Sequence, residues 1–160
     1  MNRRSSIRRQ HGIGMIEILI AVLVVSIGFL GMAALQARAL STNNSAMARS
    51  LATVASYSIL DAMRADIIQA GSGAYNTTVT ANSCPAAGGS LASSQLSTWC
   101  NQLGSALGAV ASTTGTVNCL GASSTSVNCT ITIQFDDSRA GTLGTSVGSS
   151  TQQVVTRAGL

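Results

Sequence analysis

Glu17 is the residue of this sequence whose chemistry most needs an explanation. It stands at the start of a long uncharged run in the stretch RRQHGIGMIEILIAVLVVSIGFLGMAALQ, residues 8–36. An unpaired carboxylate deep in a membrane helix costs about 2.5–3.5 kcal/mol on insertion scales. An ammonium about 4 Å away returns about 4 kcal/mol at an effective dielectric constant near 20. The carboxylate therefore predicts a cationic partner; the alternative is an unpartnered carboxylate at the headgroup boundary.

Few other side chains are suited to catalysis. The only histidine is His11 and the chain has no lysine, so acid–base chemistry would rest on a few carboxylates. No nucleophile motif or phosphate-binding glycine loop is present. Asp136 and Asp137 carry oxygen atoms that suit a cation, but their place after an expected strand is typical of turn residues. The sequence thus predicts no enzyme, no metal site and no cofactor.

The positive charge is concentrated at the N-terminus. Four of the nine basic residues, all arginines, lie within the first ten positions. From residue 13 onward five arginines balance five acidic residues, and charged residues make up only 9% of the chain. Because a nucleic-acid-binding surface needs clustered basic side chains on the folded body, no direct nucleic-acid site is expected. Basic residues before an apolar run instead orient membrane insertion.

Residues 18–35 form a run of 18 residues without a charge. As a helix this run is about 27 Å long, close to the roughly 30 Å thickness of bilayer hydrocarbon. A removable signal peptide is the alternative, because ARA at 37–39 offers a small-residue cleavage site. The apolar region of a signal peptide is only about 7–15 residues long and does not usually open with a carboxylate. The run is therefore predicted to be a membrane span.

Three features occur together in this region: a basic leader ending in Gly12, Glu17 as the fifth residue after that glycine, and the long apolar helix. Together they resemble the class III signal of type IV prepilins. The continuation EILIAVLVVSIGFLGMAALQ is similar to the PilV group of minor pilins. The resemblance is strong over residues 8 to about 40 and weaker at STWCNQL and ITIQFDDSR.

This resemblance implies a processing site. A membrane prepilin peptidase would cut the Gly12–Ile13 bond on the cytoplasmic side and methylate the new amine of Ile13. Cutting after Gly14 would instead make Glu17 the third residue of the mature chain. Ile13 and Gly14 depart from the phenylalanine and the serine or threonine that are common there, which leaves the bond assignment intact. In the mature chain the Ile13 amine would lie one helical turn from Glu17 and pair with it.

The resemblance also implies partners and a location. In a fibre, Glu17 would meet the amine of a neighbouring subunit. The expected partners are the peptidase, other major and minor pilins, and the pilus assembly platform. Before assembly the subunit would cross the bacterial inner membrane once with its head in the periplasm, and afterwards it would lie in an extracellular fibre. Major pilins commonly have a proline where this chain has Ala34, and whether the helix loosens at Gly28 and Gly31 stays open.

Residues 13–70, after a leader at 1–12, are expected to form one long helix. The half at 13–36 would serve the membrane and assembly, and the half at 37–70 is amphipathic. Its apolar residues recur three or four positions apart and define one stripe: Met47, Leu51, Val54, Tyr57, Leu60, Met63 and Ile67. STNNS at 41–45 is predicted to bend or interrupt the helix, because Asn and Ser compete for backbone hydrogen bonds. GSG at 71–73 should end it.

The remaining residues, 71–160, are expected to form a globular head that begins with a loop at 71–90. Leu96, Trp99, Leu103 and Leu107 define a short amphipathic helix with Trp99 in the core. VNCTITIQF at 127–135 alternates without a fault and is the clearest strand, with TVNCL at 116–120 as its hairpin partner and QQVVT at 152–156 as a third strand. The predicted fold class is α+β, a long helix packed against a small antiparallel sheet, similar to a pilin.

Four cysteines lie outside the membrane run: Cys84, Cys100, Cys119 and Cys129. An even count in a small extracytoplasmic head predicts two disulfides. A zinc site would need closer pairs and usually histidine. Three pairings are possible. We favour Cys119 with Cys129, because both would face inward if they lie opposite one another in the hairpin, and this leaves Cys84 for Cys100.

The pattern predicts a minor pilin that occupies few places in a type IV pilus and helps to start its assembly. Such subunits serve pilus-dependent motility, adhesion or DNA uptake. A minor pseudopilin of a type II secretion system is the alternative, because it shares the leader, the carboxylate and the helix; the continuation SIGFLG favours the pilus. A single-span membrane-anchored extracytoplasmic protein is a different class, and it would keep its leader.

With a prepilin peptidase present, we expect the mature protein to begin at Ile13 and to carry an N-methyl group. Mass spectrometry of the purified chain measures both features. A bulky residue at Gly12 should block cleavage, because the signal is defined by its spacing from that glycine. An intact leader, or a start near Leu40, would contradict the prepilin interpretation.

Overall fold

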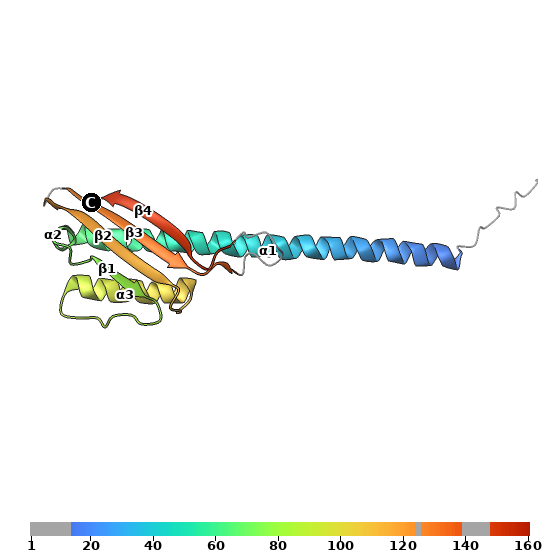
Figure 1. Ribbon diagram of the computed structural model, residues 1–160, viewed down its shortest axis with the longest axis horizontal. Coiled ribbons are helices and arrows are strands. Elements are labelled where there is room, and N and C mark those ends of the chain that lie inside the picture. Colours follow the sequence, from blue (N-terminus) through green and yellow to red (C-terminus); the bar gives the residue numbers. More distant parts are fainter. Residues whose placement is uncertain (1–13, 124–125, 139–147) are drawn as a thin grey trace, which may run out of the picture. The chain divides into compact units, whose positions relative to one another are not determined.

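The computed structural model describes residues 14–123, 126–138 and 148–160. It contains α1 (Met15–Ala65), α2 (Ile67–Gly71), β1 (Thr77–Thr80), α3 (Leu91–Leu107), β2 (Thr114–Ser123), β3 (Ser126–Phe135) and β4 (Gln152–Gly159) (Figure 1). The chain divides into two compact units, Met1–Ala39 and Leu40–Leu160, and α1 belongs to both. The second unit, which we call the head, combines helices with one antiparallel sheet. The predicted α+β class is confirmed.

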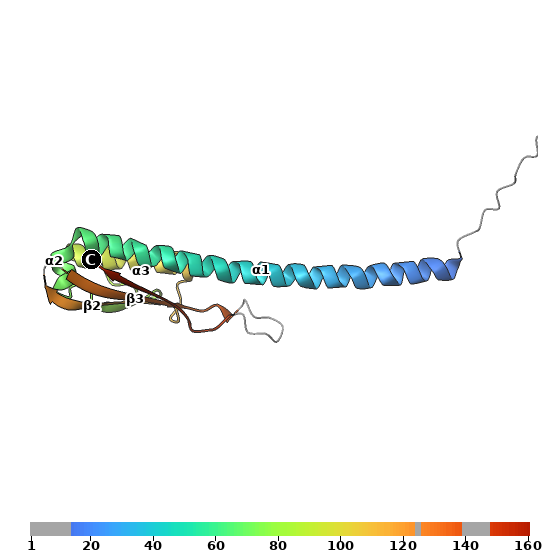
Figure 2. The ribbon, with the colours of Figure 1, turned by 90° about the horizontal axis from the view of Figure 1, so that it is seen from above.

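The four strands of the head lie in the order β1-β2-β3-β4, and each neighbouring pair is antiparallel. The head part of α1 and the whole of α3 lie on the same side of this sheet (Figures 1 and 2). The head is therefore a two-layer structure, with helices on one face and solvent on the other. This arrangement requires each strand to present apolar side chains to one face only.

The strand β3 meets this requirement most completely. Its buried side chains alternate with more exposed polar ones, and the inward set is Val127, Cys129, Ile131, Ile133 and Phe135. The predicted strands at 116–120, 127–135 and 152–156 are confirmed, and β2 and β4 are longer than expected. The expectation of a loop throughout 71–90 was wrong, because β1 lies within it. Only Val79 of the four residues of β1 is buried, so the strand has no repeated alternation of buried and exposed side chains.

The buried face of α1 in the head differs from the predicted stripe. Met47, Val54 and Tyr57 are 60%, 57% and 53% exposed, so that part of the prediction was wrong. Leu60 and Met63 are buried as expected, together with residues that the pattern had passed over, most of them small: Ser45, Ala52, Ala55, Ser56 and Ile59. The small residues allow close approach, as the bond from Trp99 Nε1 to the carbonyl oxygen of Ala55 shows, at 2.9 Å.

Two features of the long helix also differ from expectation. It is continuous through 41–45, where an interruption was predicted. Ser45 is buried there, and its hydroxyl donates to the carboxylate of Asp137, so this side chain is satisfied without disturbing the helix. The helix does break earlier than expected, at Asp66, where φ is −132° and ψ is 51°. The short α2 then continues to Gly71 and contacts β2 and β3.

The indole of Trp99 organises the core between α3 and the sheet. A Cβ atom placed on Gly115 of β2 would lie 2.5 Å from Cη2 of Trp99 and 2.6 Å from Cδ1 of Leu103. Trp99 and Leu103 are both buried. Glycine at position 115 is thus required by the close approach of α3 to β2, and this α3 core was predicted by its helical spacing.

Substituting Gly115→Ala should destabilise the head by about 1–3 kcal/mol, because the added methyl group overpacks the core against Trp99 and Leu103. Gly89→Ala is the matched control, since a Cβ atom there would have nothing within 4 Å. Urea unfolding of the oxidised protein in detergent, followed by tryptophan fluorescence, measures both variants. Equal stability of the two would contradict the described packing.

Candidate functional site: an exposed apolar helix and a disulfide-linked head

The N-terminal part of α1 has no core of its own. Every described residue from 14 to 40 is exposed, although this part of the chain is strongly apolar, with a mean hydropathy of 2.8 over an 18-residue window. A helix that is apolar on all sides must be covered by lipid or by protein. It is the one helix of the described residues that is long and apolar enough to cross a membrane.

Glu17 lies in the first turn of α1. Its backbone N–H donates to the carbonyl oxygen of Gly14 at 3.0 Å, and the same oxygen accepts from Ile18 N at 3.4 Å. The carboxylate thus belongs to the first turn of the helix, where the helix dipole favours a negative charge by about 0.3–1 kcal/mol. This stabilisation is smaller than the cost of burying the charge in a membrane, so it does not replace a cationic partner.

The predicted partner of Glu17 lies outside the described residues. Gly12 and Ile13, the residues of the expected cleavage and methylation site, both precede residue 14. Their role therefore stays a prediction from the sequence motif. The structure does place Glu17 at the helix start, which is the end of the helix that Ile13 adjoins in the sequence.

The few polar or small residues inside the apolar segment are accommodated within the helix. The hydroxyl of Ser26 donates to the carbonyl oxygen of Val22 at 2.7 Å, so no polar group of this side chain requires water. Gly28 and Gly31 lie in continuous helix, and a Cβ atom on either would meet nothing within 4 Å. No contact among the described residues therefore explains these two glycines.

The disulfide between Cys119 and Cys129 joins β2 to β3 at directly opposed positions. Their Cα atoms are 4.0 Å apart, as suits a pair that does not exchange backbone hydrogen bonds. The backbone of Cys119 instead pairs with the side chain of Asn76, which accepts from its N–H at 2.7 Å and donates to its oxygen at 3.1 Å. The amide of Asn76 thereby extends the hydrogen bonding of β2 beyond the end of β1.

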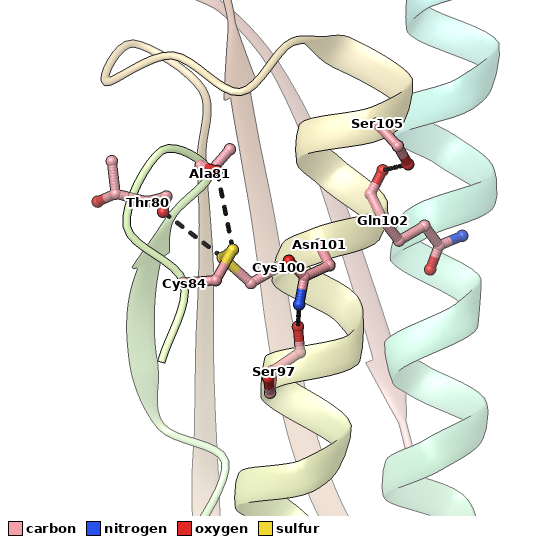
Figure 3. The surroundings of a disulfide bond; sticks show 8 residues. All are labelled: Thr80, Ala81, Cys84, Ser97, Cys100, Asn101, Gln102 and Ser105. Atoms are coloured by element: carbon pink, nitrogen blue, oxygen red, sulfur yellow. Dashed lines mark hydrogen bonds between the residues drawn. A yellow bond between two sulfur atoms is a disulfide. The ribbon is translucent and has the colours of Figure 1, made fainter. Parts of the chain in front are cut away.

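The second disulfide joins Cys84, which follows β1, to the buried Cys100 of α3 (Figure 3). The sulfur atoms lie 3.8 Å from the oxygen of Ala81 and 3.5 Å from the oxygen of Thr80. This bond fixes the segment after β1 against the helix. Both disulfides have the pairing that the sequence analysis favoured.

Asp136 and Asp137 occupy different environments. The Asp136 carboxylate accepts from the N–H of Ser138 at 2.9 Å, which is the geometry of a turn residue, as predicted. Asp137 is buried, and it accepts from Ser45 and donates its own N–H to Ser149 O at 2.8 Å. Asp137 therefore attaches the segment after β3 to α1, which the turn interpretation missed. Asp137 and Ser45 are 92 residues apart in the sequence, so no local pattern indicates their contact.

The hydroxyl of Tyr75 makes a second polar contact, which is partly buried. The ring of Tyr75 is fully buried, and the hydroxyl donates to Asp66 Oδ2 at 3.3 Å. Burial, and to a lesser degree the negative charge of Asp66, raise the pKa of Tyr75 to about 12. The phenol is therefore neutral at physiological pH, and it holds the break between α1 and α2 beside the sheet.

The described residues contain no group of three or more potential metal ligands, and all four cysteines are in disulfides. No protein-family model matches the chain, and no curated protein or solved structure is significantly similar to it. The molecule is thus defined by its own features: an α+β head and a helix suited to a membrane. These features are the candidate functional site.

Replacing Cys119 and Cys129 together by alanine should lower the free energy of unfolding by about 2–4 kcal/mol, since the covalent link between β2 and β3 is lost. Urea unfolding of this variant beside the parent measures the change. Peptide mapping without reduction should recover the Cys119–Cys129 and Cys84–Cys100 peptides from exported protein. Recovery of a Cys100–Cys119 peptide, or of free thiols, would refute the pairing.

Proposed function

We propose that this chain is a minor pilin of a type IV pilus, whose N-terminal helix first anchors it in the inner membrane and then packs in the fibre. The observation that carries the proposal is the exposed apolar part of α1 with a carboxylate in its first turn. The order of leader, Gly12, Glu17 and apolar run, which resembles a prepilin signal, supports the same function. The proposed role is structural, with other pilins, the prepilin peptidase and the assembly platform as partners.

The exposed helix suits two successive environments. In a bilayer its side chains contact lipid, and in a fibre they contact the equivalent helices of neighbouring subunits. The transfer is feasible because the segment from 14 to 37 is apolar on all sides and its one charged residue is Glu17. Gly28 and Gly31, which pack against nothing in the described part of the chain, allow close approach of a neighbouring helix.

Glu17 gives this transfer its direction. The cost of a lone carboxylate at membrane depth, about 2.5–3.5 kcal/mol, is similar to the return from an ammonium about 4 Å away. A newly made amine on Ile13 balances the charge in the single subunit. In the fibre the amine of a neighbour replaces it, so the carboxylate favours docking at one register along the helix. A plain membrane anchor gains nothing from a carboxylate at this position.

A pseudopilin of a type II secretion system has the same requirements for its helix, so the structure of α1 does not distinguish it from a pilin. The continuation SIGFLG, at residues 26–31, is the feature that favours the pilus. A single-span anchored protein is the remaining alternative, and it differs in a measurable way. It has no use for Glu17, and a more apolar span would only improve its insertion.

We expect Glu17→Val to abolish assembly while preserving insertion. The substitution removes the attraction for a neighbour's amine and also the cost of burying the charge, so the subunit should reach the membrane in at least its normal amount. Its level in sheared fibres should fall by tenfold or more, since loss of about 4 kcal/mol of pairing exceeds a tenfold effect. Complementation of a strain that lacks the gene measures this, with quantification in the sheared and membrane fractions.

Ser26→Ala is the matched control in the same segment. The Ser26 hydroxyl is bonded within its own helix, so its loss should leave both fractions unchanged. Leader removal should also be normal in Glu17→Val, because Gly12 is untouched. Normal piliation with Glu17→Val at normal abundance would rule out the assembly role of this carboxylate.

A further inference from the structure

The strand β4 forms one edge of the sheet and is the longer of its two edge strands. It pairs with β3 over eight consecutive positions without a bulge, and no strand in the described part of the chain pairs with its other side. A strand edge presents unpaired N–H and C=O groups, which bind another strand unless the edge is protected. The groups that β4 presents can be identified residue by residue.

The N–H of Leu160 donates to the carbonyl oxygen of Val127 at 2.9 Å. Since the residues of an antiparallel strand face their partner alternately, those at 152, 154, 156 and 158 direct their backbone groups to β3. Gln153, Val155, Arg157 and Gly159 therefore direct theirs outward. The pairing of β3 with β2 agrees with this assignment. The backbone groups of Cys119 bond the side chain of Asn76, so they are not available to Cys129, which lies opposite. The backbone groups of Cys129 therefore point to β4.

The outward groups of Val155 and Arg157 lie at the centre of this open edge. Among the described residues, the Gln153 oxygen already accepts from the side chain of Gln152 at 3.2 Å, whereas no hydrogen bond to the outward backbone groups of Val155 or Arg157 is found. The strand has no proline, lysine or bulge to protect it, and its one charged side chain is Arg157. Val155 is also 51% exposed, which adds an apolar side chain to the same edge.

The opposite edge, β1, is closed by comparison. It has only four residues. Because alternate residues direct their backbone groups to β2, those of Thr78 and Thr80 point outward. The oxygen of Thr80 already accepts from the N–H of Ser83 at 2.9 Å. Only one residue of β1, Thr78, keeps an outward pair of backbone groups for a partner. The two edges of the sheet therefore differ in their capacity to bind a strand.

A second copy in the same orientation does not satisfy the β4 edge. Two antiparallel β4 strands would be related by a two-fold axis perpendicular to the sheet, and this axis reverses every direction in the plane of the sheet. Because α1 lies against the face of the sheet (Figures 1 and 2), the α1 helices of the two copies would run in opposite directions. Subunits anchored in one membrane, or stacked in one fibre, run in the same direction. The other edge of a copy, β1, is too short.

We propose that the β4 edge binds an extended strand from the head of a different pilin subunit, antiparallel to β4 and hydrogen-bonded to Val155 and Arg157. This inference rests on the proposed function, and it names the surface and the partner. A β-branched residue opposite Val155 and an acidic or amide side chain near Arg157 suit the edge. The partner strand would continue the sheet of this subunit into its neighbour.

The substitution Val155→Pro tests the edge directly. It removes an N–H that points away from β3, so the sheet within the subunit is kept, while proline blocks a strand from the outer side. In sheared fibres we expect the subunit to fall about tenfold relative to the major pilin, as one hydrogen bond is lost and its neighbours are displaced. Thr78→Pro is the matched control, because it removes an outward N–H from the β1 edge and should leave incorporation unchanged.

A photo-crosslinking amino acid at position 155, with one at the exposed Val110 as control, identifies the occupant in assembled fibres. A cross-link from 155, absent from 110, to a strand of another pilin subunit supports the proposal. A cross-link to a second copy overturns it, as does normal incorporation of Val155→Pro without a cross-link. If Val155→Pro lowers membrane levels of the subunit, the cross-link alone decides.

The variant Glu17→Val separates this proposal from the proposed function. Loss of incorporation by Glu17→Val together with normal incorporation of Val155→Pro overturns the edge proposal alone. Normal incorporation of both variants overturns the pilin function, and the edge proposal with it.

Discussion

One continuous helix has to satisfy two different surroundings, and the rest of the molecule follows from that constraint. From residue 14 to 40 all described side chains of α1 are exposed, and nearly all of them are apolar. From Ser45 to Met63 the same helix buries only one face, and much of that face consists of alanine and serine. The first part gains its stability only from an external cover. The second part gains it from the head, which is the part of the chain with an internal core.

The small residues on α1 determine how the head is packed. Alanine at 52 and 55 brings neighbouring elements close to the helix axis, so the indole N–H of Trp99 reaches the backbone oxygen of Ala55. On the other side of the indole the same closeness requires a glycine, Gly115, in β2. A chain with 3% aromatic residues has few large side chains with which to fill a core. Close contact around one tryptophan, with two disulfides, replaces a larger core.

Periodic patterns predicted most of this fold. The alternation at 127–135 and the helical spacing of Leu96, Trp99 and Leu103 were sufficient for β3 and α3, because each buries one face completely. The same method failed on part of α1, where helical spacing selected the exposed Met47, Val54 and Tyr57. The helix instead buries several small residues, and α3 approaches it at Ala55. Side-chain volume predicts burial only where the neighbouring element can accommodate it. The contact of Ser45 with Asp137 and the break at Asp66 depend on distant residues, so no local pattern indicates them.

The predictions about the candidate site also divide into those that depend on local sequence and those that depend on distant groups. Glu17 was selected from its charge and spacing, which are local, and the structure places it in the first turn of α1. The proposed amine partner lies on Ile13 or on a neighbouring subunit, so it stays a prediction from the sequence motif. The disulfide pairing was predicted from strand register, since Cys119 and Cys129 face inward together only if their strands are in that register.

The register that the Cys119–Cys129 disulfide requires also determines which groups the head presents outward. A shift of one residue between β2 and β3 would separate the two sulfur atoms and turn Ile131 and Ile133 towards solvent. In the observed register the backbone of Cys119 turns to Asn76, so that of Cys129 turns to β4. Position 158 then faces β3, and positions 155 and 157 face outward. A covalent bond in the core is thus coupled to the hydrogen-bonding pattern of a surface edge, because antiparallel pairing alternates regularly from 114 to 120 of β2 and across β3 and β4.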